Sequence, residues 1–205
     1  MQTLAVSIAL CAVLLAGFVA FFFWRSLRQR AELQRLAGEL ERLRREAGRL
    51  DQDPLTELGN RTALMRWLEE QPAFQGWVVV CDLDDFKLLN DRYGHLVGDE
   101  ILRGAGQLIA ASIRPEDRAY RWGGDEFVIF FRSSERPVIE ARLREVEERL
   151  LKFQVRHHGP LPVRFSWGLA ATGGRPLRES LEEADQAMLG TKRQRPQDSL
   201  TTPQT

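Results

Sequence analysis

The chain has 205 residues, of which 43% are hydrophobic and 28% are charged. This composition is typical of a globular protein rather than a low-complexity or disordered chain, and the length suits one domain of about 150 residues with an appendage. The 29 basic and 29 acidic side chains balance, so the charge gives no support to general binding of nucleic acid or another polyanion. Two cysteines in separate apolar runs exclude a disulfide framework and a cysteine-rich zinc site, and they favour a reducing compartment.

Residues 1–24 contain no charged side chain. A helix needs about 20 apolar residues to cross the hydrocarbon layer, and Trp24 ends the run where interfacial aromatic residues lie. Arg25, Arg28 and Arg30 follow at once. The positive-inside rule therefore predicts a single-pass transmembrane helix in the inner (cytoplasmic) membrane, with the rest of the chain in the cytoplasm. The alternative is a cleaved signal peptide, although the run lacks a basic start and a small-residue cleavage site.

Residues 25–52 show the spacing of a coiled coil. Steps of three and four residues separate the apolar positions Leu33, Leu36, Leu40, Leu43, Ala47 and Leu50. This heptad pattern predicts a dimerisation helix, in which Glu39 would face Arg44 of a parallel partner. The pattern lasts only about three heptads, so a single amphipathic helix lying on its own domain is the alternative. We expect the helix to end before Pro54, whose ring disfavours helix at the preceding residue.

Helical and strand patterns then alternate up to residue 192. We expect helices at 61–70, 86–93, 98–113, 137–152 and 177–191, and strands at 77–83, 118–122, 126–131 and 162–171. Asn60 is placed to cap the first helix, and a Gly-Gly-Asp turn is placed to join the second and third strands as a hairpin. The continuous apolar run at 77–83 is typical of a buried central strand. These elements predict an α/β or α+β domain with helices packed on a sheet.

Acidic side chains appear at the C-terminal end of the strand predicted at 77–83. Carboxylates such as Asp82 then lie where open α/β sheets bind ligands, and Mg²⁺ prefers carboxylate and phosphate oxygens. A second acid, Asp125, follows Gly123 and Gly124 in a turn whose bare backbone lets a ligand approach closely. A solvated loop and an ordinary hairpin turn are the alternatives. If the hairpin pairs beside strand 77–83, Asp82 and Asp125 can share a divalent ion of the kind that stabilises phosphoryl transfer.

Four motifs, in this order, resemble those of the GGDEF-domain diguanylate cyclases. They are Asp53–Arg61 (DPLTELGNR), Asp82–Asp91 (DLDDFKLLND), Gly94–Asp99 (GHLVGD) and Gly123–Phe127 (GGDEF). The resemblance covers residues 53–192 and implies a nucleotidyl cyclase or polymerase palm-like fold, with a central, mainly antiparallel sheet flanked by helices. It also implies condensation of two GTP molecules, one held by each protomer of a homodimer, into cyclic di-GMP and pyrophosphate, with Mg²⁺ or Mn²⁺ as cofactor.

The resemblance assigns roles to residues by their place in the motifs. Metal ligands are Asp82, the carbonyl of Leu83 and Asp125; guanine is held by Asn90, His95 and Asp99; Lys192 contacts the triphosphate; Gly123 and Gly124 form the substrate-binding turn. Asp125 is also implied as the base that activates the 3′-hydroxyl, and Lys87 as a cation that stabilises the transition state. Outside the motifs, Asn90 would be interpreted as a turn cap, His95 as a core side chain and Asp99 as a helix cap.

Two further segments bear on regulation and on substrate affinity. Arg114 and Asp117 match the family's inhibitory RxxD site, which implies feedback inhibition by cyclic di-GMP, whereas a surface salt bridge is the alternative. Leu189 stands where the family usually has Tyr, and the Gly-Arg-Asn that usually follows Lys192 is absent. A second phosphate-binding arginine is therefore missing unless Arg195 replaces it.

These expectations describe a membrane-anchored diguanylate cyclase that dimerises through a coiled coil. Its parts are a transmembrane helix at 1–24, a juxtamembrane helix at 25–52, a GGDEF domain at 53–192 and a disordered tail at 193–205. One alternative is a catalytically weak GGDEF domain that senses cyclic di-GMP or GTP. Another is a structural membrane anchor that recruits partners through the helix at 25–52.

Overall fold

The computed structural model describes residues 18, 24–25, 28–30, 32–39, 42, 48, 50–71, 74–132 and 135–194. The chain divides into two compact units, Met1–Leu50 and Asp51–Thr205.

In the first unit, the described residues are helical, including the run 32–39. Leu33, Leu36 and Leu50 are exposed, as the seam positions of a coiled-coil helix are in a single chain. The heptad positions Leu40, Leu43 and Ala47, and the predicted ion-pair residue Arg44, lie outside the described residues. Pairing of this helix with a second chain therefore stays a prediction.

The membrane prediction rests on residues 1–24, most of which lie outside the described part of the chain. Within the described part, no helix is both long and apolar enough to cross a membrane. The transmembrane helix stays a prediction from sequence. The tail predicted at 193–205 also lies largely outside, apart from Arg193 and Gln194, which are the last residues of a helix.

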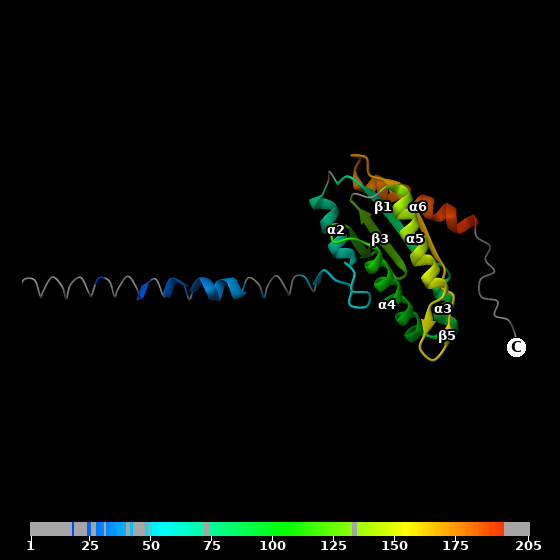
Figure 1. Ribbon diagram of the computed structural model, residues 1–205, viewed down its shortest axis with the longest axis horizontal. Coiled ribbons are helices and arrows are strands. Elements are labelled where there is room, and N and C mark those ends of the chain that lie inside the picture. Colours follow the sequence, from blue (N-terminus) through cyan, green and yellow to red (C-terminus); the bar gives the residue numbers. More distant parts are fainter. Residues whose placement is uncertain are drawn as a thin grey trace, which may run out of the picture. The chain divides into compact units, whose positions relative to one another are not determined.

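The second unit is built on a four-stranded antiparallel sheet with the strand order β2-β3-β1-β6 (Figure 1). The strands are β1 (Trp77–Leu83), β2 (Arg118–Arg121), β3 (Glu126–Phe131) and β6 (Phe165–Ala171). β1 is central, and its residues from Val78 to Leu83 are all buried. This confirms the buried central strand predicted from the apolar run at 77–83, and the mainly antiparallel sheet implied by the family resemblance.

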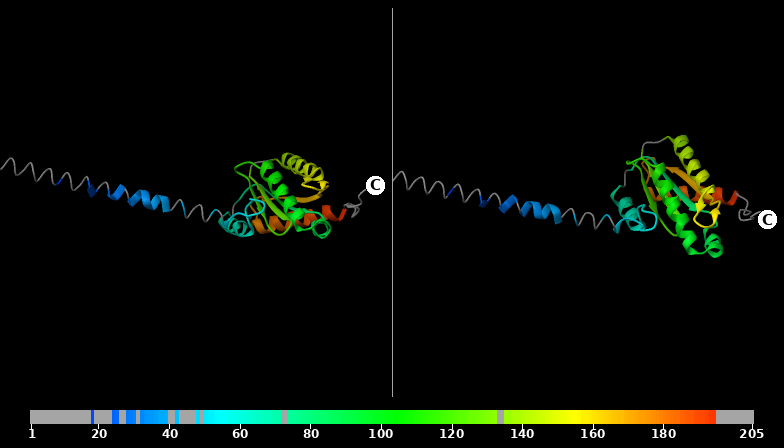
Figure 2. Two further views of the ribbon diagram at one scale, coloured as in Figure 1. Left: turned by 90° about the horizontal axis from the view of Figure 1, so that it is seen from below. Right: turned by 60° about the horizontal axis from the view of Figure 1, so that its bottom comes forward.

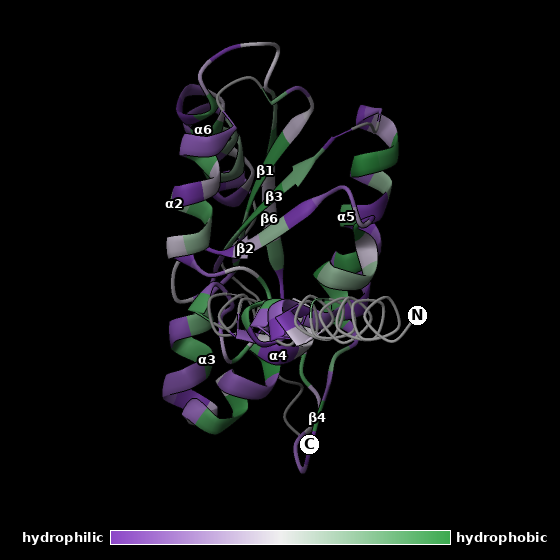
Figure 3. Ribbon diagram, turned by 90° about the vertical axis from the view of Figure 1, so that its left-hand side faces the viewer, coloured by the Kyte–Doolittle hydropathy of each residue, from purple (hydrophilic) through white to green (hydrophobic). Residues whose placement is uncertain are grey.

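Helices cover both faces of the sheet. They are α2 (Arg61–Glu70), α3 (Phe86–Tyr93), α4 (His95–Ser112), α5 (Arg136–Leu151) and α6 (Leu177–Gln194). In Figure 3, α2 and α6 lie on one side of the sheet and α5 on the other, and Figure 2 shows the same layers from two further directions. Alternate residues of β1 enter two cores: Val79 and Cys81 pack with α4 and α5, whereas Val78 and Val80 pack with α2 and α6.

The predicted helices and strands are confirmed with small shifts at their ends. The largest shifts are of three residues: α4 begins at His95 rather than at residue 98, β6 begins at Phe165 rather than at residue 162, and α6 ends at Gln194 rather than at residue 191. Gly94 has φ 85°, a conformation favourable to glycine, so one residue both ends α3 and reverses the chain into α4. Gly98 then lies inside α4, where an added Cβ would collide with the Asn90 side chain of α3.

A small hairpin was not predicted. It consists of the two-residue strands β4 (Gln154–Val155) and β5 (Gly159–Pro160). Strands this short contain no measurable alternation of polar and apolar residues, so the sequence pattern carries no signal for them.

Candidate active site

The ends of β1 and β3 bring the two predicted metal-binding acids to one edge of the sheet. Asp82 lies opposite Glu126 in the β1–β3 register, and the Leu83 amide donates a 3.2 Å hydrogen bond to the Asp125 carbonyl. The hairpin therefore pairs beside strand 77–83, which is the condition on which a shared cation depends.

A lysine from the far end of the chain contacts these acids. The Lys192 ammonium, in the last turn of α6, donates a hydrogen bond to Asp82 Oδ1 and lies 3.7 Å from Asp84 Oδ1. Asp84 Oδ2 accepts a 2.9 Å hydrogen bond from the Ser166 hydroxyl on β6. Strands β1 and β6 and helix α6 thus build one cluster of three charged groups.

Burial dominates the electrostatics of this cluster. It raises the pKa of Asp82 to about 6, an effect that contact with Lys192 reduces and the nearby charges of Asp125 and Asp84 increase. Burial alone would lower the pKa of Lys192, but the hydrogen bond to Asp82 and the surrounding carboxylates raise it above its ordinary value. The single positive charge of Lys192 therefore does not fully balance the negative charges of Asp82, Asp84 and Asp125.

This arrangement fits a divalent cation. The atoms that would contact the cation are carboxylate oxygens at the end of a strand, and oxygen is the ligand that hard cations prefer. The cluster already attracts one positive group, since Lys192 contacts Asp82. In the part of the chain that the structure describes, no group of three His, Cys, Asp or Glu side chains has the geometry of a metal site. The predicted set of two carboxylates and the Leu83 carbonyl needs further oxygens from substrate phosphates or water, as Mg²⁺ sites commonly do.

The turn Gly123–Asp125, named here the GGD turn, is held by an arginine that the sequence did not single out. Arg121 Nε lies 3.1 Å from the carbonyls of both Gly123 and Gly124, and Nη2 donates to the Gly124 carbonyl at 2.7 Å. Its Nη1 donates to both carboxylate oxygens of Asp53 at 3.1 Å. The guanidinium thus fixes the turn that carries Asp125 to the first residues of the domain.

The predicted guanine-binding residues lie around the junction of α3 and α4. Asn90 is half-buried, with an Oδ1 atom that has no hydrogen-bond partner within the described residues. His95 is exposed, which excludes the alternative of a core histidine. Asp99 lies one turn inside α4, which excludes the alternative of a cap at its start. Lys87 is exposed in the first turn of α3.

The structure separates the two side chains of the predicted RxxD site. Asp117 is buried, and its carboxylate accepts 3.0 Å hydrogen bonds from the backbone amides of Arg114 and Arg132. Arg142 of α5 lies 3.7 Å from the same carboxylate. The Arg114 guanidinium is exposed and lies 3.9 Å from Glu116. Asp117 therefore stabilises its own turn, and Arg114 is the member of the pair that faces solvent.

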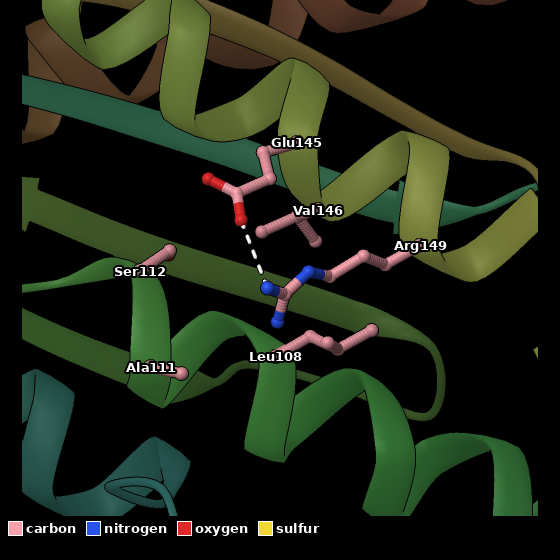
Figure 4. A pocket seen from close by; sticks show the side chains of 6 residues that line it. All are labelled: Leu108, Ala111, Ser112, Glu145, Val146 and Arg149. Atoms are coloured by element: carbon pink, nitrogen blue, oxygen red, sulfur yellow. Dashed lines mark ion pairs between the residues drawn. The ribbon is translucent and has the colours of Figure 1, made fainter.

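Among the residues that the structure describes, cavities also lie away from this cluster. One of about 250 Å³ is lined by Val80, Trp122, Glu126, Val128, Leu181, Glu182 and Asp185. Another, of about 150 Å³ between α4 and α5, is shown in Figure 4, where Glu145 and Arg149 of α5 form an ion pair of 3.0 Å along its lining. Neither cavity is lined by a predicted catalytic or metal-binding side chain.

At the C-terminal end, α6 brings Lys192 to Asp82 and Asp84, and its contact with the triphosphate stays a prediction. Leu189, which replaces the family's usual Tyr, is 39% exposed. Arg195 lies outside the described residues.

Known proteins are similar in sequence to this chain. The family model described as "Diguanylate cyclase, GGDEF domain" matches residues 50–198. The diguanylate cyclase DgcS of Shewanella oneidensis is 51% identical over 83 residues, which cover 38% of this chain and 28% of the relative. The diguanylate cyclase DgcP of Pseudomonas aeruginosa is 33% identical over 149 residues, which cover 69% of this chain and 22% of the relative. The chain thus spans about a quarter of the length of these curated relatives.

Among solved structures, the coiled coil and GGDEF domain of DgcB from Caulobacter crescentus, in complex with c-di-GMP, superposes with a TM-score of 0.68. It is 29% identical, and the match covers 82% of this chain and 93% of that one. The family model covers well over half of this chain, and the acids of its motifs meet at one sheet edge. The chain therefore belongs to the GGDEF-domain diguanylate cyclase family.

Proposed function

We propose that this chain synthesises cyclic di-GMP from two GTP molecules. The observation that carries the proposal is the approach of Lys192 and of the turn with Asp125 to Asp82 at the end of β1, in a chain that has four family motifs in order. In each of two steps, a 3′-hydroxyl oxygen forms a bond to the α-phosphorus of the other GTP. The bond from that phosphorus to the bridging oxygen breaks, and pyrophosphate leaves.

The chain's own residues hold the reactants and move the proton. Asp125 takes the proton from the attacking 3′-hydroxyl, at the tip of a turn that Arg121 holds in place. Asp82, Asp125 and the Leu83 carbonyl would hold Mg²⁺ or Mn²⁺, which when bound neutralises charge on the phosphates and orients them. The exposed Lys87 ammonium offsets charge that develops on the phosphate oxygens.

Guanine recognition follows from the α3–α4 junction. The Asn90 carboxamide can both donate and accept, and its buried oxygen has no hydrogen-bond partner among the described residues. The Asp99 carboxylate can accept from N1–H and N2–H of guanine. His95 and the GGD turn complete the proposed nucleotide site.

A homodimer is part of the proposal, because each half-site holds one GTP. A coiled coil at 25–52 would raise the local concentration of the second half-site, and a transmembrane helix at 1–24 would fix the chain in the inner membrane with its domain in the cytoplasm. The exposure of Leu33 and Leu36 supports the pairing of this helix.

The test is chromatography of products after the full-length chain is incubated with GTP and Mg²⁺. We expect cyclic di-GMP and pyrophosphate from the wild type, and a loss of at least about 100-fold in Asp125→Ala, since both a base and a metal ligand are removed. Glu148→Ala, which removes an exposed carboxylate on α5, is the control and should keep full activity. An active Asp125→Ala protein would contradict the assignment.

A second candidate is a catalytically weak GGDEF domain that binds cyclic di-GMP or GTP as a sensor. The replacement of the usual Tyr by Leu189, and the missing Gly-Arg-Asn, favour it. Retained nucleotide binding without product from the wild type would support the sensor.

Feedback inhibition is proposed at Arg114, with Asp117 shaping the turn rather than supplying a free carboxylate. We expect Arg114→Ala to raise the cyclic di-GMP concentration needed for half-inhibition by about tenfold or more, because Arg pairs in a forked manner with phosphate. Unchanged inhibition of the variant at micromolar cyclic di-GMP would argue against this site.

A further inference from the structure

Lys192 contacts the same carboxylate that is assigned to the metal. Its ammonium donates a hydrogen bond to Asp82 Oδ1 and lies 3.7 Å from Asp84 Oδ1. The Asp82 side chain is 12% exposed, so few positions around its oxygens remain open to other groups. The Lys192 ammonium thus already lies against the acidic cluster.

The position of this lysine follows from the packing of α6. Helix α6 lies against β6 and β1, and Gly168 of β6 lets it approach so closely that an added Cβ would collide with the backbone at Ala184 and Met188. Ala184 and Met188 are buried in the core beneath the helix. The last turn of α6 is therefore directed onto the C-terminal end of β1 by a rigid contact.

An ammonium and a divalent cation that contact the same carboxylate lie close together and repel each other strongly. The contact of Lys192 with Asp82 therefore opposes the binding of a cation to this carboxylate. The lysine side chain is 37% exposed and sits on a flexible four-carbon stem, so it can swing away without unfolding the helix. The Lys192 ammonium then needs a new anionic partner, because the divalent cation brings two positive charges to the cluster.

We propose that Lys192 is a built-in competitor for the cation at Asp82, so that a divalent cation binds tightly only together with a nucleotide whose phosphates take over the ammonium. The inference rests on the proposed metal site and adds an order of events to it. In the nucleotide-free chain, Lys192 neutralises Asp82 and weakens metal binding. When the triphosphate arrives, Lys192 moves from the carboxylate to a phosphate oxygen, and Asp82 becomes free to hold the metal.

The test is titration of the nucleotide-free, full-length chain with Mn²⁺ alone, with free Mn²⁺ followed by electron paramagnetic resonance. We expect Lys192→Met to bind Mn²⁺ at least about tenfold more tightly than the wild type, because a nearby unit charge is removed. Lys192→Arg keeps the charge and should bind as weakly as the wild type. Lys152→Met removes an exposed lysine at the end of α5 and should also match the wild type.

A second titration includes a GTP analogue that cannot lose pyrophosphate. We expect Mn²⁺ affinity of the wild type to rise when the analogue is present, and that of Lys192→Met to rise less. Equal Mn²⁺ affinity of wild type and Lys192→Met without nucleotide would overturn the inference, while loss of binding in Asp82→Asn would leave the proposed metal site intact. Absence of Mn²⁺ binding in every variant, with and without the analogue, would overturn the metal site as well.

Discussion

Arg121 and Asp53 form the contact that joins the GGD turn to the beginning of the domain. Both side chains are only 16% exposed, and the guanidinium donates to both carboxylate oxygens of Asp53 and to the carbonyls of Gly123 and Gly124. Asp53 Oδ1 also accepts 2.8 Å hydrogen bonds from the amide and hydroxyl of Thr56. Such charge-assisted bonds are stronger than neutral ones and fix geometry.

The same contact makes the stability of the domain depend on pH. Burial alone would raise the pKa of Asp53, but the hydrogen bonds from Thr56 and the charge of Arg121 bring it below its ordinary value of 3.8. A carboxylate with a lowered pKa stabilises the fold above its unfolded pKa, and this stabilisation is lost as the pH falls through the folded pKa.

We therefore expect the free energy of unfolding to decrease as the pH falls below about 4. At neutral pH, Asp53→Asn should lower it by about 2 kcal/mol, since charged hydrogen bonds are lost, and should weaken the acid dependence. Urea unfolding measured from pH 3 to pH 7 checks both effects. The exposed Asp91→Asn serves as a control with wild-type behaviour; an Asp53→Asn protein with the same acid profile as the wild type would contradict the explanation.

Sequence reasoning identified the residues of the site one by one but not their partners. Asp82 and Lys192 are 110 positions apart, and Asp53 and Arg121 are 68 apart. No periodicity or motif spacing links side chains at such separations, because their distance depends on how α6 and the 53–60 segment pack on the sheet. The inward position of Asp117 was missed for a related reason, since one of its donors is the amide of Arg132, 15 positions along the chain.

At the scale of elements, regular patterns were predicted well and irregular ones poorly. The strand at 77–83 and the helix at 61–70 were placed correctly, with Asn60 accepting from the Ala63 amide at 2.9 Å as the predicted cap. The predicted start of α4 was wrong, because the prediction placed Gly98 at the start of the helix and the helix begins at His95. In the structure its missing side chain makes room for Asn90 of α3.

The proposed dimer depends on the helix predicted at 25–52. If it forms a coiled coil, Leu40→Lys places a charge in the apolar seam and weakens pairing, whereas Gln34→Lys adds the same charge outside the seam. We expect Leu40→Lys to lower cyclase activity about tenfold at nanomolar protein and to recover as protein concentration rises, because two half-sites must meet. Activity assays across a concentration series check this.

Gln34→Lys should keep wild-type activity at every concentration in that series. A loss in Leu40→Lys that does not change with protein concentration would indicate damage to the fold. It would also remove the support for pairing through this helix.

For the whole molecule, the zero net charge is the sum of two regions with opposite net charges. Residues 25–52 carry eight arginines against five acidic residues, while the remainder after residue 52 has 21 basic against 24 acidic side chains. The acidic excess suits a domain that would bind its nucleotide through a cation and a few local bases. Zero net charge therefore argues against a general polyanion-binding surface without arguing against a site for two particular nucleotides.

The sequence by itself determined the family, the order of strands and helices, and the identity of the acids at the end of β1. These depend on local periodicity and on motif spacing, which a linear chain displays directly. Only the tertiary structure decided that Arg121 holds the GGD turn, that Asp117 faces inward and that Lys192 lies on Asp82. The physical reason is that Arg121 joins the turn to Asp53, Asp117 accepts from Arg132 and Lys192 donates to Asp82 across 68, 15 and 110 positions, so these contacts form only after the sheet and its covering helices have packed.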